Sequence, residues 1–188
     1  MSTSLKGHFL VAAKHMRDSN FYRTVVLMVE HGLTGAMGLV VNRPSSISVS
    51  QALAGHIELP ETGDLVYIGG PVEPGALFIL HNQQDLDNQQ AAVLPNLFVG
   101  GSPATFEHIV RSLQNSDDHI RYRIFAGCAG WGANQLEGEI DRGDWYSLPA
   151  NEEFLFHPDP YSIWDLALTQ ISLPHRLHPE LPQNPEWN

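Results

Sequence analysis

Short apolar segments separated by turn residues run through most of the chain and predict a β-rich fold. Residues 23–30 (RTVVLMVE) and 36–42 (AMGLVVN) flank HGLTG, a turn with two glycines, so the two segments are expected to pair as a hairpin. Pro44 is expected to end this hairpin, because proline has no N–H to donate to a ladder. The other expected strands are 8–14, 65–68, 76–81, 97–99, 122–125 and 145–148.

Apolar residues at helical spacing predict fewer helices than strands. The clearest helix spans 102–113, because serine is a favoured N-cap and proline is favoured at the first helical position. The other expected helices are 49–54, capped by Ser48, 133–141, and one that Asp159-Pro160 opens and that reaches about residue 171. Strands come first and then mix with helices, which predicts an α/β or α+β fold: a compact single domain around a mixed β-sheet with flanking helices.

The chain of 188 residues suits one domain, which we expect to span residues 1–173. Residues 174–188 are polar and rich in proline, so they are expected to form an extended or disordered tail. The polar, glutamine-rich stretch 82–92 is expected to be a surface loop.

Charge and cysteine content narrow the class of protein. The single cysteine, Cys128, allows no intrachain disulfide, and no long apolar run precedes or interrupts the domain, so we expect a cytoplasmic protein that does not enter the membrane. The net charge is −11, and only two lysines occur. An acidic body without a basic stripe repels phosphate backbones, so direct binding of nucleic acid is not expected.

Two segments have the spacing of a nucleophile elbow, in which a nucleophile stands on a tight turn between a strand and a helix. Ser102 lies in GGSPA, but the following Pro103 has no N–H for an oxyanion, so Ser102 is expected to be a helix cap. Cys128 lies in AGCAG, where a helix downstream could lower its pKa. The alternative is that Cys128 is a small buried residue with no catalytic role.

Recognised metal and nucleotide motifs are absent from the sequence. It contains no HExxH, CxxC, P-loop or GxGxxG pattern, so neither a metal nor a cofactor is expected. Glu137, Glu139 and Asp141 share the expected helix 133–141, where like charges four residues apart are typical of a solvated face.

Three segments together resemble one known family. They are NFYRTVVLMVEHGLTGAMGLVVNRP (20–44), VYIGGPVEPGALFILH (66–81) and AGCAGWGANQLEGEIDRGDW (126–145). The motifs NRP, GGP and AGWGxxQLExE in this order are similar to those of the YqgE/AlgH family of bacterial proteins, and the resemblance covers about residues 7–173. It implies a compact α/β structure around a mixed sheet, and it supplies no established substrate, cofactor or catalytic residue.

Seven motif residues are the candidates for a binding site. They are Asn42, Arg43, Gly70, His81, Trp131, Gln135 and Glu137. Asn42, Arg43, His81 and Gln135 are polar groups beside the ends of strands or helices, where sites on sheet-based folds tend to form. The alternative is a structural hydrogen-bond network, and Arg43 is expected either to pair with an acidic side chain or to anchor an anionic ligand.

Three functions remain open from the sequence. The first is a non-enzymatic binding or regulatory protein that acts through a small ligand or a protein partner. The second is a hydrolase-like enzyme that uses Cys128. The third is a transcription-associated regulator, a label that some members of the resembled family carry.

The charge distribution predicts the result of a gel-shift experiment. Micromolar protein should leave duplex DNA unshifted at about 50 mM salt, where even non-specific electrostatic binding is strong. A shifted band that disappears with rising salt would contradict this interpretation of the acidic surface.

Overall fold

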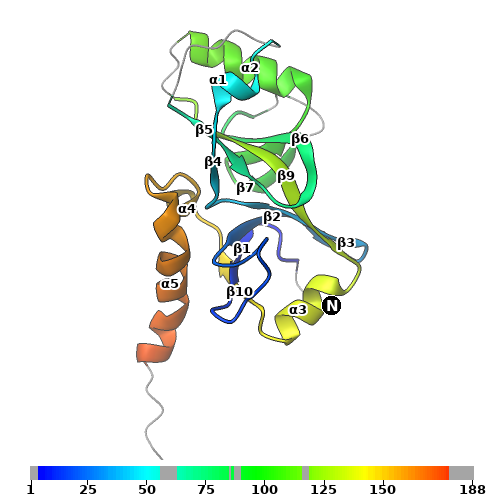
Figure 1. Cartoon of the computed structure of the whole chain (residues 1–188), viewed down its shortest axis with the longest axis vertical. Helices are drawn as coiled ribbons and strands as arrows, with labels where there is room; N and C mark the ends of the chain where they lie inside the picture. The colour runs from blue at the N-terminus through cyan, green and yellow to red at the C-terminus, as the bar shows by residue number, and fades with distance from the viewer. Residues whose placement is uncertain (1–3, 56–62, 85, 87–89, 116–118, 178–188) are drawn as a thin grey trace, which may run out of the picture.

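The computed structural model describes residues 4–55, 63–84, 86, 90–115 and 119–177, and its strands join in one sheet (Figure 1). The strand order is β10-β1-β2-β3-β9-β6-β8-β7, with β5 pairing to both β4 and β9 off this path. The strands are β1 His8–Ala12, β2 Val25–Gly32, β3 Gly35–Val40, β4 Pro44–Ser48, β5 Leu65–Ile68, β6 Val72–His81, β7 Ala91–Leu94, β8 Leu97–Gly100, β9 Tyr122–Gly132 and β10 Trp145–Pro149.

Within the described ranges, five helices and one 3₁₀ turn pack around this sheet. They are α1 Val49–Ala52, α2 Pro103–Gln114, α3 Gln135–Asp141, α4 Glu152–Leu155 and α5 Ile163–Leu177, with a 3₁₀ turn, η1, at Pro160–Ser162. Figure 1 shows α1 and α2 at the end that holds β5 and β6, α3 near β3, and α5 alongside β1 and β10.

Residues of β1 and β2 alternate between two apolar clusters on opposite faces of the sheet. Phe9 and Leu27 face the cluster that α4 and α5 complete, whereas Leu10 and Val26 face the cluster that contains Leu136 of α3. A strand buried on both faces reads as a continuous apolar run, which is why the sequence VVLMV shows no alternation of polar and apolar residues. A third cluster lies beneath α1 and α2.

Strand β9 joins two parts of the sheet, β10-β1-β2-β3 on one side and β6-β8-β7 on the other. Its last residues pair antiparallel with β3, its first residues pair antiparallel with β6, and Phe125 and Ala126 pair in parallel with β5. The sheet is therefore mixed, as predicted, and because most of its pairs are antiparallel the fold is α+β rather than α/β.

Glycines allow the chain to cross β9 at very close range. A Cβ added at Gly70 would overlap the backbone of Cys128, and one at Gly69 would overlap the carbonyl of Gly127. Gly127 has a φ of 69°, and a Cβ added there would overlap the carbonyl oxygen of Gly70. The crossing is held by bonds from Gly69 N–H to the Ala126 carbonyl and from Val40 N–H to the Gly69 carbonyl, both of 2.8 Å.

Several predicted boundaries need correction. Pro44 begins β4 instead of only ending the hairpin, and its missing N–H is tolerated because β4 is paired on one side, to β5. The expected loop 82–92 includes the start of β7, and residues 85 and 87–89 lie outside the described residues. Helix α4 was not predicted, since four residues carry too little periodicity to detect.

The C-terminal helix is longer than predicted. Helix α5 continues past residue 171 to Leu177, so residues 174–177 of the expected tail are helical in the structure. Residues 178–188 lie outside the described residues, and the boundary of the domain at residue 173 stays a prediction.

The close crossing of β9 predicts that one methyl group added at Gly70 strongly destabilises the protein. Gly70→Ala should lower the free energy of unfolding by about 3 kcal/mol or more, because backbone strain and overpacking each cost about 1–3 kcal/mol. Gly75→Ala is the matched control, since a Cβ there meets no atom within 4 Å. Urea unfolding of both variants measures the difference, and equal stability would contradict the close crossing.

Candidate functional site

Asn42 is a structural residue of the sheet edge. Its side chain is buried; Oδ1 accepts from Val25 N–H at 2.9 Å, and Nδ2 donates to the Arg23 carbonyl at 2.9 Å. The amide group thus extends the ladder between β2 and the chain after β3, next to the backbone bond from Val41 N–H to the Val25 carbonyl at 2.9 Å.

Arg43 binds backbone carbonyls, which neither of its two expected roles included. Its guanidinium donates to Asn20 O at 2.6 Å, Ser19 O at 3.1 Å and Tyr22 O at 3.2 Å. Burial lowers the pKa of Arg43, and Asp18 opposes that shift. Because its donors are taken up by the chain itself, Arg43 holds the segment before β2 in place and does not present a free anion-binding fork.

Trp131 and Gln135 belong to a network centred on a carboxylate. Glu139 Oε2 accepts from the indole N–H groups of Trp131 and Trp145 at 2.9 and 2.8 Å, and Glu139 Oε1 accepts from Gln135 Nε2 at 3.0 Å. Glu139 therefore lies against two indoles, on a different side of the helix from the pair Glu137 and Asp141 for which a solvated face was predicted. Glu137 accepts from His31 Nε2 at 3.1 Å, on the same helix but with a different partner.

His81 and Gly70 complete the set of predicted residues, and each lies apart from the others. His81 is fully buried in β6, stacks on Phe98, and accepts from Gln83 N–H through Nδ1 at 3.3 Å. Burial lowers the pKa of His81 to about 4, so this imidazole is neutral at physiological pH. Gly70 lies at the crossing of β9. The structure therefore does not bring the seven predicted residues together in one pocket.

Cys128 lies within β9 and not on a turn between a strand and a helix, because β9 continues to Gly132. The thiol is buried. Burial raises the pKa of Cys128, and the nearby Glu73 raises it further. A raised pKa reduces the thiolate fraction, which is opposite to what a nucleophile requires.

A hollow of about 420 Å³ lies where β4, β5 and β9 meet the segment between α4 and α5. Arg123 projects from β9 into the wall of this hollow, and Tyr67 comes from β5, two register positions along the parallel ladder. Asp64, just before β5, and Phe156, just after α4, contribute two further walls. None of these residues is among the seven motif residues predicted from the sequence.

The guanidinium of Arg123 lies over two aromatic rings. It lies 4.2 Å from the centre of the Tyr67 ring and 5.8 Å from that of Phe156. Among the described residues, its one hydrogen bond is long, from Nη1 to the Val41 carbonyl at 3.5 Å. Burial lowers the pKa of Arg123, an effect that Tyr67 and Asp64 oppose, and burial also raises the pKa of Tyr67.

The neighbouring polar groups have partners of their own. The Tyr122 hydroxyl donates to Asp64 Oδ2 at 2.6 Å, and Arg121 pairs with Glu152 at 2.6 Å while lying over the Phe156 ring. Tyr161, which is largely exposed, separates this hollow from a smaller one of about 350 Å³ that Arg23 and Arg43 line.

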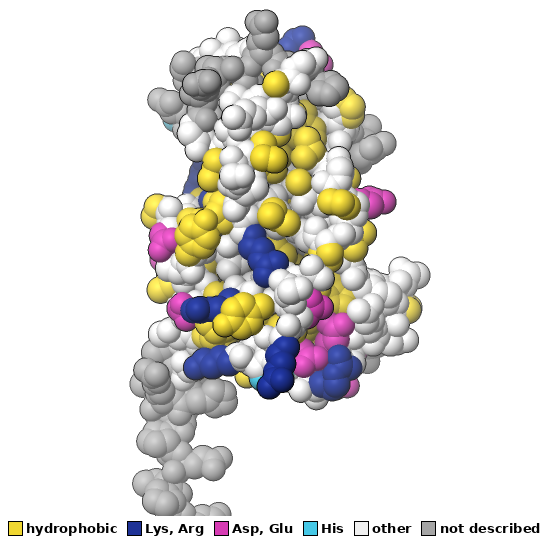
Figure 2. Space-filling model, viewed as in Figure 1, with side chains coloured by type: hydrophobic (Ala, Val, Ile, Leu, Met, Phe, Trp, Pro, Cys, Tyr) yellow, Lys and Arg dark blue, Asp and Glu magenta, His cyan; other side chains and the backbone are white. Residues whose placement is uncertain are grey.

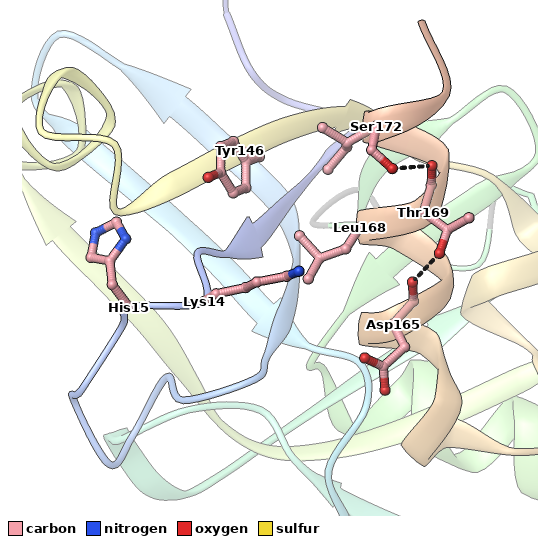
Figure 3. Close-up of a pocket in the computed structure, with 8 residues that line it drawn as sticks. Lys14, His15, Tyr146, Asp165, Leu168, Thr169 and Ser172 are labelled. Atoms are coloured by element: carbon pink, nitrogen blue, oxygen red, sulfur yellow. Dashed lines mark hydrogen bonds between the residues drawn. The ribbon is translucent and has the colours of Figure 1, made fainter. Parts of the chain in front are cut away.

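A larger hollow of about 680 Å³ lies between α5 and the strand β10 (Figure 3). Two of its hydroxyl groups donate within the helix, Thr169 to the Asp165 carbonyl and Ser172 to the Thr169 carbonyl, both at 2.9 Å. The Asp165 carboxylate pairs with Arg23 at 2.8 Å. The hollow at Arg123 is the better candidate for a binding site, because it combines a partly desolvated guanidinium with aromatic and apolar walls.

A different signal could have indicated the Arg123 hollow. Arg121 and Arg123 are the closest pair of arginines in a chain with few cations; Arg121 precedes the predicted strand 122–125, and Arg123 lies within it. Their aromatic partners come from distant segments without a shared motif, so no spacing rule connects them in the sequence.

Other properties of the described residues bear on the class of protein. On the face shown in Figure 2, Lys and Arg side chains lie mainly in the lower half of the described surface, and several of them are beside Asp or Glu. The described residues contain no cluster of three or more His, Cys, Asp or Glu side chains placed to hold a metal ion. Within the same residues, no helix has the length and apolar character needed to cross a membrane.

Comparison with known proteins places the chain in a family. A family model described as AlgH-like matches residues 9–176. A UPF0301 protein of Myxococcus xanthus is 37% identical over 168 residues, covering 88% of this chain and 90% of the relative. One of Chlorobaculum tepidum is 34% identical over 162 residues, covering 86% of this chain and 84% of the relative.

Solved structures agree with this assignment. The solution structure of the AlgH protein from Pseudomonas aeruginosa matches with a TM-score of 0.75 and 30% identity over 98% of both chains. A protein of Corynebacterium diphtheriae shares the fold with a TM-score of 0.74 at 24% identity, covering 96% of this chain and 94% of that one. The chain belongs to the AlgH-like family, as the NRP, GGP and AGWGxxQLExE motifs indicated.

The carbonyl contacts of Arg43 predict a moderate loss of stability on truncation. Arg43→Ala should lower the free energy of unfolding by about 2 kcal/mol, the range for hydrogen bonds to a charged group. Arg43→Lys should recover only part of the lost stability, because an ammonium group lacks the planar fork of a guanidinium. Arg111→Ala, which breaks an exposed helical ion pair with Glu107, is the control and should cost less than about 0.5 kcal/mol. Unchanged stability of Arg43→Ala in urea unfolding would contradict this role.

The environment of Cys128 predicts an inert thiol. Iodoacetamide should fail to label the folded protein below pH 8 and should label it fully in denaturant, because burial raises the thiol pKa. Mass spectrometry measures the extent of alkylation. Rapid labelling of the folded protein near neutral pH would instead favour a reactive cysteine.

Proposed function

We propose that this protein is a non-enzymatic cytoplasmic binding or regulatory protein that acts by holding a small ligand in the hollow at Arg123. The observation that carries the proposal is the state of the Arg123 guanidinium. It is partly desolvated beside Tyr67 and Phe156, and its donors have one long bond among the described residues. A carboxylate or phosphate oxygen on a ligand would satisfy these donors.

The shape and walls of the hollow support binding of a small molecule. A volume of about 420 Å³ lies within the usual range of about 300–1,000 Å³ for ligand sites. The walls combine aromatic and apolar side chains with a few polar groups, as ligand sites commonly do. A protein partner remains the second way in which a regulatory protein could use this surface, by inserting an acidic side chain beside Arg123.

The other two functions receive less support. A hydrolase that uses Cys128 is disfavoured by the burial and the raised pKa of that thiol. Direct DNA binding is disfavoured by the net charge of −11, so a role in transcription would have to pass through a ligand or another protein.

The proposal predicts a ligand response that depends on Arg123. A mixed panel of small carboxylates, phosphates, amines and neutral compounds is titrated into ¹⁵N-labelled protein, with backbone amides and the arginine Nε–H groups followed by NMR. Some of these compounds should move the Arg123 Nε–H signal and the amide signals of β5 and the segment after α4, and Arg123→Gln should abolish the response of those amides.

Arg111→Gln is the matched control, since Arg111 lies on α2 and does not line the hollow. Circular dichroism of each variant establishes that it is folded. A panel in which no compound moves these signals in the wild-type protein would sink the proposal.

A further inference from the structure

The hollow at Arg123 contains a second charged group, of opposite sign. Asp64 lines the same hollow, and its Oδ2 accepts from the Tyr122 hydroxyl at 2.6 Å. Within the described part of the chain, Asp64 and Arg123 form no ion pair with each other, although Asp64 raises the pKa of Arg123. The hollow thus presents a cation and an anion that are close enough to interact but do not neutralise each other by direct contact.

The remaining walls are mainly apolar. Val49, Leu65, Ile124, Pro158 and Pro160 line the hollow together with the Phe156 ring. Such walls favour an apolar group on the ligand, because its burial removes apolar surface from water. The hollow therefore combines three binding requirements: a site for an anion, a site for a cation, and an apolar surface between or beside them.

We propose that the ligand of this hollow is a free α-amino acid with an apolar side chain, held with its carboxylate on Arg123 and its ammonium group on Asp64. The inference rests on the proposed function, and it names the chemical class of the ligand. The side chain of the amino acid lies against the apolar walls, and the Tyr67 and Phe156 rings keep the Arg123 guanidinium in place behind the carboxylate.

The two charges explain why a zwitterion fits better than a simple anion. A ligand with only a carboxylate or phosphate brings a second negative charge next to Asp64, and this like-charge contact is unfavourable. It must also approach a protein with a net charge of −11. A zwitterion carries no net charge and satisfies both groups, so neither wall charge is left without a partner when water is displaced.

Three probes that differ only in charge test this proposal. L-Phenylalanine is a zwitterion, N-acetyl-L-phenylalanine keeps only the carboxylate, and L-phenylalaninamide keeps only the ammonium group. Each is titrated into the full-length protein, and binding is followed by NMR at the Arg123 Nε–H signal and the amides of β5. The zwitterion should bind at least about tenfold more tightly than either blocked form.

Two variants test which residue of the hollow binds each charged group of the ligand. Asp64→Asn should remove the preference for the free ammonium group, so that L-phenylalanine and N-acetyl-L-phenylalanine bind with similar affinity. Arg123→Gln should abolish binding of L-phenylalanine and N-acetyl-L-phenylalanine alike, as followed at the amides of β5. Asp141→Asn, an exposed acid on α3 away from the hollow, should leave all three affinities unchanged.

The outcomes separate this inference from the function on which it rests. If N-acetyl-L-phenylalanine or L-phenylalaninamide binds wild-type protein as tightly as L-phenylalanine, the zwitterion proposal is wrong and the binding function stands. The same holds if only other anions from the mixed panel move the signals. If no probe and no compound of that panel moves them, both proposals fail together.

Discussion

The close passage of the chain across β9 is the constraint on which the rest of the structure depends. Gly69 and Gly70 lie against the backbone of residues 126–128 at a distance that a Cβ would prevent. This passage lets β9 pair with β3 at one end and with β5 and β6 at the other. The parallel pairing of Tyr67 with Phe125 then sets Tyr67 beside Arg123, two residues earlier on the same face of β9.

The Asn-Arg-Pro segment supports the same region from the other side. Asn42 and Arg43 bind the backbone before β2, while the Arg43 carbonyl accepts from Ile68 N–H at 2.8 Å and Pro44 pairs with Tyr67. The segment therefore connects the first hairpin to β5 and forms part of the wall around the hollow. Its polar side chains act on the architecture of the site, and the ligand contacts we propose come from other residues.

Local signals allowed much of the fold to be predicted, and long-range placement explains most of what was missed. The Ser102 cap, the first hairpin and the mixed sheet follow from turn and capping chemistry that acts over a few residues. The full length of β9 could not be predicted from such local signals, because the glycines of residues 126–132 suggest a turn unless the strands that flank them are known. The seven motif residues were candidates for a site, with a structural hydrogen-bond network as the alternative, and hydrogen bonds such as those to Glu139 fit that alternative for several of them.

The arginines around the hollow differ in how their charge is balanced, and this difference singles out Arg123. Arg121 pairs with Glu152, Arg23 pairs with Asp165, and Arg43 binds three carbonyls. Arg123 is stacked on aromatic rings, which act on the face of the guanidinium and contribute about 0.5–2 kcal/mol. Its N–H groups point outward in the plane of that fork, where rings cannot accept them. Stacking therefore offsets part of the cost of desolvating Arg123 and leaves its in-plane donors open to the oxygen atoms of a ligand in the hollow.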